Sequence, residues 1–363
     1  MANMPKSSTA RLEHPKTCQA LFQLFLQGRA VTKEVDLGVE TFARGEEVKS
    51  WIQAAQIVIQ QQVEPIATTG PHCDQPYSCG FYDYCSKDEP QAEMPIYWLP
   101  RLNRQAWIEQ GIIDLKDIPV EELNPVQQRV RDCTIRDKVF FDRKGAVEDL
   151  AHAPLPLYFL DFETIQFAVP IWVGTRPYQQ IPFQFSLHRF TPKGELLQDE
   201  FLDISGNDPS RPFAEYLVKC MRKRGAVFVY SAAFEKSRIS ELAERFPDLA
   251  PSLLAINERV IDLLPIARNR YYHPSQHGSW SIKKVLPAVA PELRYDALEG
   301  VQDGGMAMDA YLEAIDADTS AERKAQIQQQ LLTYCRLDTY AMVRLWQAFS
   351  GQKTKGSKHA KTI

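Results

Sequence analysis

The sequence predicts an α/β protein in which a mixed sheet is flanked by helices, and three observations lead to this prediction. From about residue 155, apolar runs of strand length alternate with helical stretches. The composition, 44% hydrophobic and 24% charged, is close to the globular average and supports a real core. The 363 residues exceed the roughly 100–200 usual for one domain, so we expect two domains.

The N-terminal half is expected to form a smaller region that contains cysteines and is α/β or mainly helical. Residues 1–16 and 351–363 are polar and charged, which predicts flexible tails at both ends. Residues 17–100 include EEVKSWIQAAQIVIQQQVEPI, whose apolar spacing predicts a half-buried helix, and the cysteine-rich stretch PHCDQPYSCGFYDYC. Residues 101–152 carry short helical stretches and are predicted to connect the two domains.

Residues 153–350 are predicted to form the main domain. Its expected strands are PLPLYFLDFET, IPFQFSLHRF, ELLQDEFLD, AVFVYS and RVIDL. Its expected helices include DPSRPFAEYLVKCMRKR, FEKSRISELAERF and the strongly amphipathic QQQLLTYCRLDTYAMVRLWQAF. Strands followed and separated by helices indicate an α/β layout, without internal repeats.

Acidic residues stand where several of these elements begin or end. Asp161 and Glu163 are two apart on the first strand, so both side chains point to the same face of the sheet. Glu235 lies in the first turn of a helix, where the helix dipole favours its charge. Tyr334 and Asp338 are four apart and share one helical face. The alternative for each is structural: acids at a strand end in solvent, simple charge compensation at Glu235, and a core aromatic at Tyr334.

Carboxylates that face one another raise each other's pKa, and divalent cations relieve this repulsion. Oxygen ligands favour Mg²⁺ or Mn²⁺. Two such ions can activate a water and stabilise the leaving oxygen of a phosphodiester without a protein nucleophile. Tyr334 would then orient or deprotonate that water.

The ordered set LDFET, VYSAAFEKSRI, IDLLPIARNRYYHPSQHGSWSIKKVLPAV and YCRLDTYAMV resembles the motifs of the DEDD 3'-to-5' exonucleases, which have an RNase H-like fold. The final Y-x-x-x-D is similar to the subtype whose water-orienting residue is tyrosine. The resemblance implies that Asp161, Glu163 and Asp338 bind one metal ion, with Asp161 bridging to a second ion near Glu235. It implies a phosphodiesterase acting on a single-stranded 3' end of DNA or RNA.

Two positions depart from that pattern. The second motif of the family usually reads N-A-x-F-D, whereas this chain has Ser231 and Glu235 at its ends. Charge is kept at Glu235, but the carboxylate is one methylene longer. Asp262 matches a position that is structural more often than it is a ligand. These departures motivate the alternative hypothesis of a catalytically inactive RNase H-like module that binds nucleic acid or acts as a scaffold.

Cys73, Cys79 and Cys85 recur at intervals of six in a loop with Pro and Gly, which suits thiolate ligation of zinc or an iron–sulfur cluster. The candidates for a fourth ligand are Cys18, Cys133 and His72; the alternative is a set of buried thiols. Three cysteines with one distant cysteine resemble the 4Fe-4S staple of Cas4-like and AddB-like PD-(D/E)XK nucleases.

PHCDQPYSCGFYDYC together with YFLDFET, RPYQQIPFQFSLHRF and GSWSIKKVLP is similar to the bacterial family called domain of unknown function 2779, over about residues 15–350. Members usually carry a PD-(D/E)XK-like half before the RNase H-like half. The resemblance implies that residues 17–100 are a remnant of that first half. We expect this chain to lack most of the first half. A third hypothesis is therefore an iron–sulfur partner of a nuclease, whose chemistry lay in that half.

Net charge and hydropathy limit which partners and which cell compartment we expect for this protein. The net charge is -4 and the pI about 6.0, so contact with nucleic acid must come from local basic patches or metal ions. No stretch approaches the roughly 20 apolar residues of a membrane span and no signal peptide is evident, which predicts a cytoplasmic protein. Candidate substrate contacts are Tyr178, Phe183, Phe185, His188 and Arg189, although such aromatics are more often sheet core. His273 and His277 are expected in a solvent-exposed turn.

Overall fold

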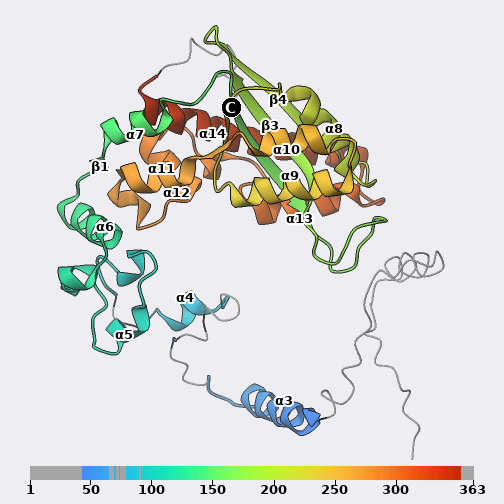
Figure 1. Ribbon diagram of the computed structural model, residues 1–363. Coiled ribbons are helices and arrows are strands. Elements are labelled where there is room, and N and C mark those ends of the chain that lie inside the picture. Colours follow the sequence, from blue (N-terminus) through green and yellow to red (C-terminus); the bar gives the residue numbers. More distant parts are fainter. Residues whose placement is uncertain are drawn as a thin grey trace, which may run out of the picture. The chain divides into compact units, whose positions relative to one another are not determined.

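The structure is a computed structural model that describes residues 43–64, 69–70, 73, 79–87, 89 and 91–352 (Figure 1). The described chain divides into two compact units. The first contains the described residues up to Ala92 together with Ala168–Pro177, and the second contains Glu93–Phe167 and the chain from Tyr178 onward. The segment 101–152, expected as a connector, is thus part of the second unit.

The first unit has two described helices, α3 (Gly45–Ile59) and α4 (Tyr82–Cys85). Helix α3 forms where the apolar spacing predicts it. The expectation that it is half-buried is wrong for the part of the chain described, because none of its residues is buried and Trp51 is 55% exposed. The spacing of apolar residues fixes which side of a helix is apolar, but it does not supply a surface for that side to pack on.

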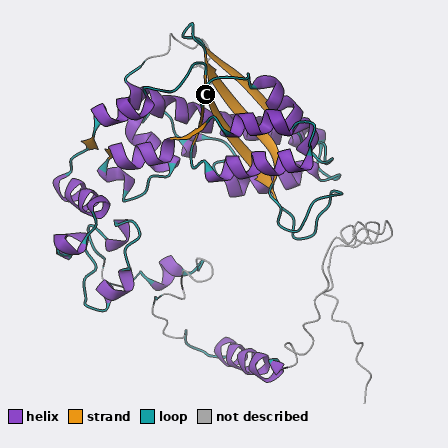
Figure 2. Cartoon of the chain, viewed as in Figure 1, coloured by secondary structure: helices purple, strands orange, loops and turns teal. Residues whose placement is uncertain are grey.

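The second unit is built on a five-stranded mixed sheet flanked by helices (Figure 2). Its strands are β2 (Leu157–Ile165), β3 (Ile181–Phe190), β4 (Leu196–Leu202), β5 (Val227–Val229) and β6 (Val260–Asp262). The order across the sheet is β4-β3-β2-β5-β6; β2, β3 and β4 are antiparallel neighbours, whereas β5 and β6 run parallel to β2. All five strands lie where the sequence predicts them.

Helices cover both faces of this sheet (Figure 1). They are α8 (Ser210–Cys220), α9 (Ala233–Arg245), α10 (Ala250–Asn257), α11 (Leu263–Arg270), α12 (Ile282–Val289), α13 (Gly304–Ile315) and α14 (Ala321–Ser350). On one face, Phe162 of β2 packs edge-on against Phe213 of α8, with ring centroids 5.1 Å apart. On the other face, Phe159 meets Trp346 of α14 at 6.0 Å. Strand β2 is therefore buried on both sides, which explains its almost continuous apolar sequence.

Helix α14 spans 30 residues and fixes the position of its site residues through its ends and its packing. The hydroxyl of Ser320 accepts a hydrogen bond from the backbone N–H of Arg323 at the N-terminus. Gly351, at φ 71°, ends the helix in the left-handed conformation that glycine adopts freely. Thirteen of its residues are buried, so the helix cannot rotate about its axis without exposing apolar surface.

The segment before β2 forms α5 (Arg104–Ile108), α6 (Pro125–Arg136), β1 (Phe140–Phe141) and α7 (Arg143–Leu150), and β1 pairs with β7 (Tyr271–Tyr272). A close contact holds this segment on the sheet domain. Gly278 has a φ of 75°, and a Cβ there would lie 1.5 Å from the carbonyl oxygen of Trp98. The Trp98 ring stacks on the ring of His277, with centroids 3.9 Å apart. No helix in the described part of the chain has the length and hydropathy to cross a membrane.

Candidate functional site

The site is built around the C-terminal part of β2. Asp161 and Glu163 project to the face of the sheet that α14 covers, as the alternation along the strand predicts, because Phe159 on that face packs on α14 while Phe162 packs on the opposite side. Asp161 is partly buried and Glu163 is buried at 8% exposure. Two carboxylates are thus held against a helix, away from bulk water.

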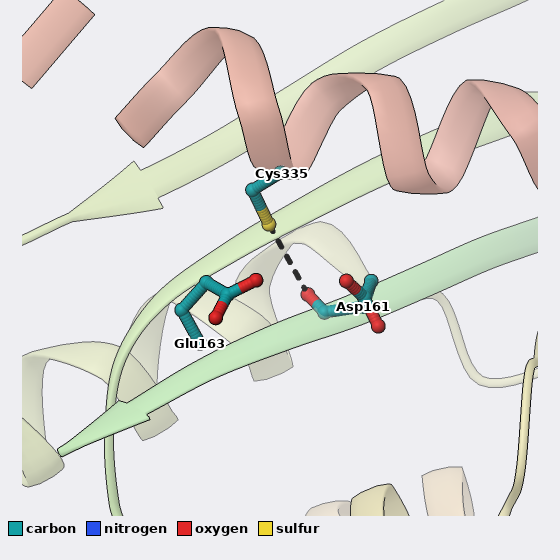
Figure 3. A group of neighbouring side chains, drawn as sticks. All are labelled: Asp161, Glu163 and Cys335. Carbon is teal, nitrogen blue, oxygen red and sulfur yellow. Dashed lines mark hydrogen bonds between the residues drawn. The ribbon is translucent and has the colours of Figure 1, made fainter. Parts of the chain in front are cut away.

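Helix α14 brings three further side chains to these acids. Tyr334, Cys335 and Asp338 are all buried on the helix. Figure 3 shows Cys335 pointing from α14 toward β2, where its thiol lies 3.9 Å from the backbone oxygen of Asp161. Ligand atoms of Asp161, Glu163 and Cys335 all lie within 4.8 Å of one another. In the described chain, this is the one group of three or more acidic, cysteine or histidine side chains close enough to hold a metal ion together. It contains Asp161 and Glu163, the two acids that the sequence predicted as ligands.

Glu235 approaches from the turn after β5. It lies in the first turn of α9, is 2% exposed, and its Oε2 has no hydrogen-bond partner. Its negative charge contributes to raising the pKa of Asp161, which places it in electrostatic reach of the cluster. The turn that carries it has Ser231 at a φ of 75°. A serine tolerates this left-handed conformation less well than asparagine or glycine, so the backbone of this turn is strained.

Asp262 has a structural role. Its carboxylate accepts hydrogen bonds from the backbone N–H groups of Ser231 and Ala232, both at 2.9 Å, and from Leu264 at 2.9 Å. It therefore caps α11 and fixes the turn that leads to Glu235. This agrees with the minor role assigned to Asp262 from sequence.

Sequence reasoning missed three members of the site. Tyr295 donates a hydrogen bond from its hydroxyl to Oδ1 of Asp338 at 2.6 Å. Lys283 places its ammonium 5.4 Å from the ring centroids of both Tyr295 and Tyr334. Cys335 is the third. Lys283 lies in the helix start SWSIKKVL and Cys335 directly follows Tyr334, so both stood inside motifs that the sequence analysis had singled out. The local sequence around Tyr295 contains no signal that points to the acids.

Burial dominates the electrostatics of the cluster. Desolvation raises the pKa of Asp161 well above its usual value, and the nearby charges of Asp338, Glu163 and Glu235 raise it further. Desolvation and Asp338 raise the pKa of Glu163 in the same way, while Lys283 opposes the shift. The pKa of Asp338 rises to about 6 through desolvation, against hydrogen bonds from Tyr295 and Tyr334 and the charge of Lys283.

The same burial acts on Glu235, Tyr334 and Cys335. Desolvation raises the pKa of Glu235 to about 8, and Asp262 adds to the shift. The pKa values of the Tyr334 hydroxyl and the Cys335 thiol also lie above their usual ranges, through desolvation first and the neighbouring carboxylates second. Positive charge brought into this cluster would relieve the repulsion among its acids.

The three predicted cysteine ligands lie in the first unit. Cys73 is buried, Cys85 is partly buried and Cys79 is exposed. The backbone N–H of Cys79 donates to the carbonyl of Cys73 at 2.7 Å. Cys133 lies in the second unit, while the candidate ligands Cys18 and His72 lie outside the described residues. A metal at these thiols stays a prediction.

Most of the predicted substrate aromatics belong to the core. Phe183, Phe185 and His188 on β3 are buried, in line with the structural alternative. Arg189 is partly buried, and Tyr178, 67% exposed, is the one of this set that lies open to solvent. The basic run MRKR precedes β5 at its N-terminal end, whereas the acids lie toward the C-terminal ends of β2 and β5.

Comparisons with known proteins find one family model and one distant relative for this chain. The family model "Domain of unknown function (DUF2779)" matches residues 158–281, from the second residue of β2 to the residue before α12. The uncharacterized protein MG366 homolog of Mycoplasma pneumoniae is 28% identical over 207 residues, which cover 52% of this chain and 31% of that protein. The chain therefore matches about a third of the length of this curated relative. No solved structure matches. The region from Tyr158 to Ser281, with Asp161, Glu163, Glu235 and Asp262, is similar to a family whose function is not described.

Proposed function

We propose that this protein is a metal-dependent 3'-to-5' exonuclease that hydrolyses phosphodiester bonds of DNA or RNA. The observation that carries the proposal is the convergence of Asp161, Glu163, Glu235 and Asp338 from three separate elements into one buried, acidic cluster next to Tyr334. The strand order, with three antiparallel strands followed by two parallel ones on the other side of β2, supports an RNase H-like assignment.

The side chains fit divalent ions. The cluster offers carboxylate oxygens, which suit Mg²⁺ and Mn²⁺, and the buried Oε2 of Glu235 has no partner within the described protein. Asp161, Glu163 and Asp338 would hold one ion, and Asp161 with Glu235 a second. When bound, the ions supply the Lewis acidity that activates a water and stabilises a leaving oxygen.

Of the remaining residues, one would position the attacking water and another balances the negative charge of the carboxylates. Tyr334 would orient the attacking water through its hydroxyl. Lys283, fixed by a hydrogen bond of its ammonium to the carbonyl of Gln302 at 2.9 Å, lowers the pKa of Glu163 and Asp338. It keeps these carboxylates closer to the ionised form that binds cations.

A catalytically inactive RNase H-like module that binds nucleic acid or acts as a scaffold is the second candidate. The hydrogen bond from Tyr295 favours it, because this bond occupies an oxygen of Asp338 that the first ion would use. Cys335 adds a thiol to the group of possible ligands, and Mg²⁺ prefers oxygen ligands to sulfur.

The test is degradation of single-stranded DNA and RNA labelled at the 3' or the 5' end, with Mg²⁺ or Mn²⁺. We expect nucleotides to leave the 3' end only with metal, and Asp161→Asn to lower the rate at least about 100-fold. Asp199→Asn, a partly buried carboxylate on β4 outside the cluster, is the matched control and should act as the wild type. Intact DNA and RNA in every reaction, with binding retained, would favour the inactive module instead.

A further inference from the structure

A cavity of about 680 Å³ lies in the second unit, outside the acidic cluster. Four parts of the chain form its wall: the segment before β2, the turn after β5, α11, and residues 278–282, which lead into α12. Arg101, Ser231, Arg268, Trp280 and Ile282 represent these parts. Its volume is in the range of pockets that hold small organic ligands.

The charge on the wall selects for an anion. Arg101 and Arg268 line the cavity, and no aspartate or glutamate is among its lining residues. The chain as a whole carries a net charge of -4, so this positive region is local. Much of the remaining wall is apolar, from Val126, Leu264 and Ile282 among others. A ligand that suits both parts has an anionic group and an apolar body.

Two segments connect the cavity to the acidic cluster. The turn after β5 contributes Ser231 to the cavity and, four residues later, Glu235 to the cluster. The start of α12 contributes Ile282 to the cavity, while the next residue, Lys283, reaches the rings of Tyr295 and Tyr334. The two sites are therefore neighbours that share their supporting backbone.

We propose that this cavity binds one nucleotide unit of a single-stranded nucleic acid, with its phosphate at Arg268 and Arg101 and its base against the apolar wall. Guanidinium groups bind phosphates through charge and paired donors, and a base can bury its flat face on apolar surface. The inference rests on the proposed function for the identity of the anion. It adds to that function a binding site in which the segment before β2 takes part.

The first experiment is fluorescence anisotropy of a 5'-labelled single-stranded oligonucleotide with the full chain in EDTA, so that no hydrolysis occurs. Arg268→Ala should weaken binding about tenfold and reduce the salt dependence of the affinity by about one phosphate contact. Arg101→Gln should weaken binding as well, which keeps the test valid if Arg268→Ala does not fold. Arg224→Ala, an exposed arginine before β5 at the opposite end of that strand, is the matched control and should bind as the wild type.

Competition identifies the ligand further. A nucleoside monophosphate should displace the oligonucleotide at lower concentration than inorganic phosphate does, because it also offers a base. Folded Arg268→Ala and Arg101→Gln variants that bind as the wild type would overturn the proposal. Inorganic tripolyphosphate competing as well as an oligonucleotide of equal charge would also overturn it, since only charge would then be recognised.

Failure of this inference and of the nuclease proposal can be told apart. If no preparation hydrolyses nucleic acid but Arg268→Ala still loses binding in EDTA, the cavity is a nucleic-acid site on an inactive module. If the wild type hydrolyses nucleic acid and both arginine variants keep its KM, the nuclease proposal stands and the cavity proposal fails.

Discussion

At the residue scale, the burial of His188 makes the unfolding free energy of the protein depend on pH. Desolvation and the charge of Arg336 lower its pKa to about 3, and its Nδ1 lies 2.8 Å from Oγ1 of Thr339 on α14. In the unfolded chain the imidazole takes up a proton near pH 6.5. Between these two pKa values the unfolded state binds more protons, so stability falls as the pH drops from 6.5 toward 3.

We therefore predict that the wild type loses about 2 kcal/mol more unfolding free energy than His188→Gln between about pH 7.5 and pH 5. Urea unfolding at the two pH values measures this difference. His152→Gln removes an exposed histidine and serves as the control, with the same loss as the wild type. Equal losses for wild type and His188→Gln would mean that His188 does not stay neutral in the folded protein.

The two tyrosines of the site separate a positioning role from a structural one. Both tyrosines hydrogen-bond Asp338, but Tyr334 lies one helical turn before it on the same helix, α14, whereas Tyr295 reaches it from a separate segment. We predict that Tyr334→Phe lowers the hydrolysis rate about 100-fold or more with little change in KM, while Tyr295→Phe lowers it less than about 10-fold. Steady-state kinetics on a labelled oligonucleotide measure both. Comparable losses in the two variants would remove the special role of Tyr334.

At the element scale, the contact between the segment before β2 and the sheet domain depends on one glycine. A side chain at Gly278 would strike the Trp98 carbonyl and also force a left-handed residue to carry a Cβ. We predict that Gly278→Ala destabilises the second unit by about 3 kcal/mol or more in urea unfolding. Gly111→Ala is the matched control: Gly111 has a φ of 76° but open space around it, so it measures backbone strain alone. If both variants lose the same stability, the close approach to Trp98 has no energetic weight.

Local patterns explain which elements could be predicted. Alternation along β2 places Asp161 and Glu163 on one face, and apolar runs of strand length located the five strands. The partners of α3 could not be predicted, because an apolar stripe does not identify what covers it. Lys283 on α12 and Tyr295 in the turn that follows α12 reach the acids because both contact α14, and such contacts between distant segments leave no periodic signal in the sequence. The cavity at Arg268 also could not be predicted, because segments that are distant in the sequence form its wall.

At the scale of the whole molecule, the acidic cluster stores repulsion that the fold must overcome. Desolvation raises the pKa values of Asp161, Glu163 and Asp338, and the charge of Asp338 raises those of Asp161 and Glu163 further, so their ionised forms destabilise the folded state at neutral pH. A cation that binds only the folded protein stabilises it by mass action, by about 2.7 kcal/mol at a metal concentration 100 times its Kd. The metal site and the stability of the second unit are thereby linked.

We predict that saturating Mn²⁺ raises the Tm of the wild type by roughly 5–10 °C over its value in EDTA. Asp161→Asn should lose this rise and, in EDTA, melt above the wild type, because one charge of the repelling set is gone while the shape of the side chain is kept. Asp199→Asn should keep the metal-dependent rise. Thermal unfolding followed by circular dichroism measures all three without any assay of hydrolysis. A wild-type Tm that does not change with Mn²⁺ would argue against a metal at the acids, and an Asp161→Asn variant less stable than the wild type in EDTA would mean that the carboxylate is held by contacts stronger than the repulsion around it.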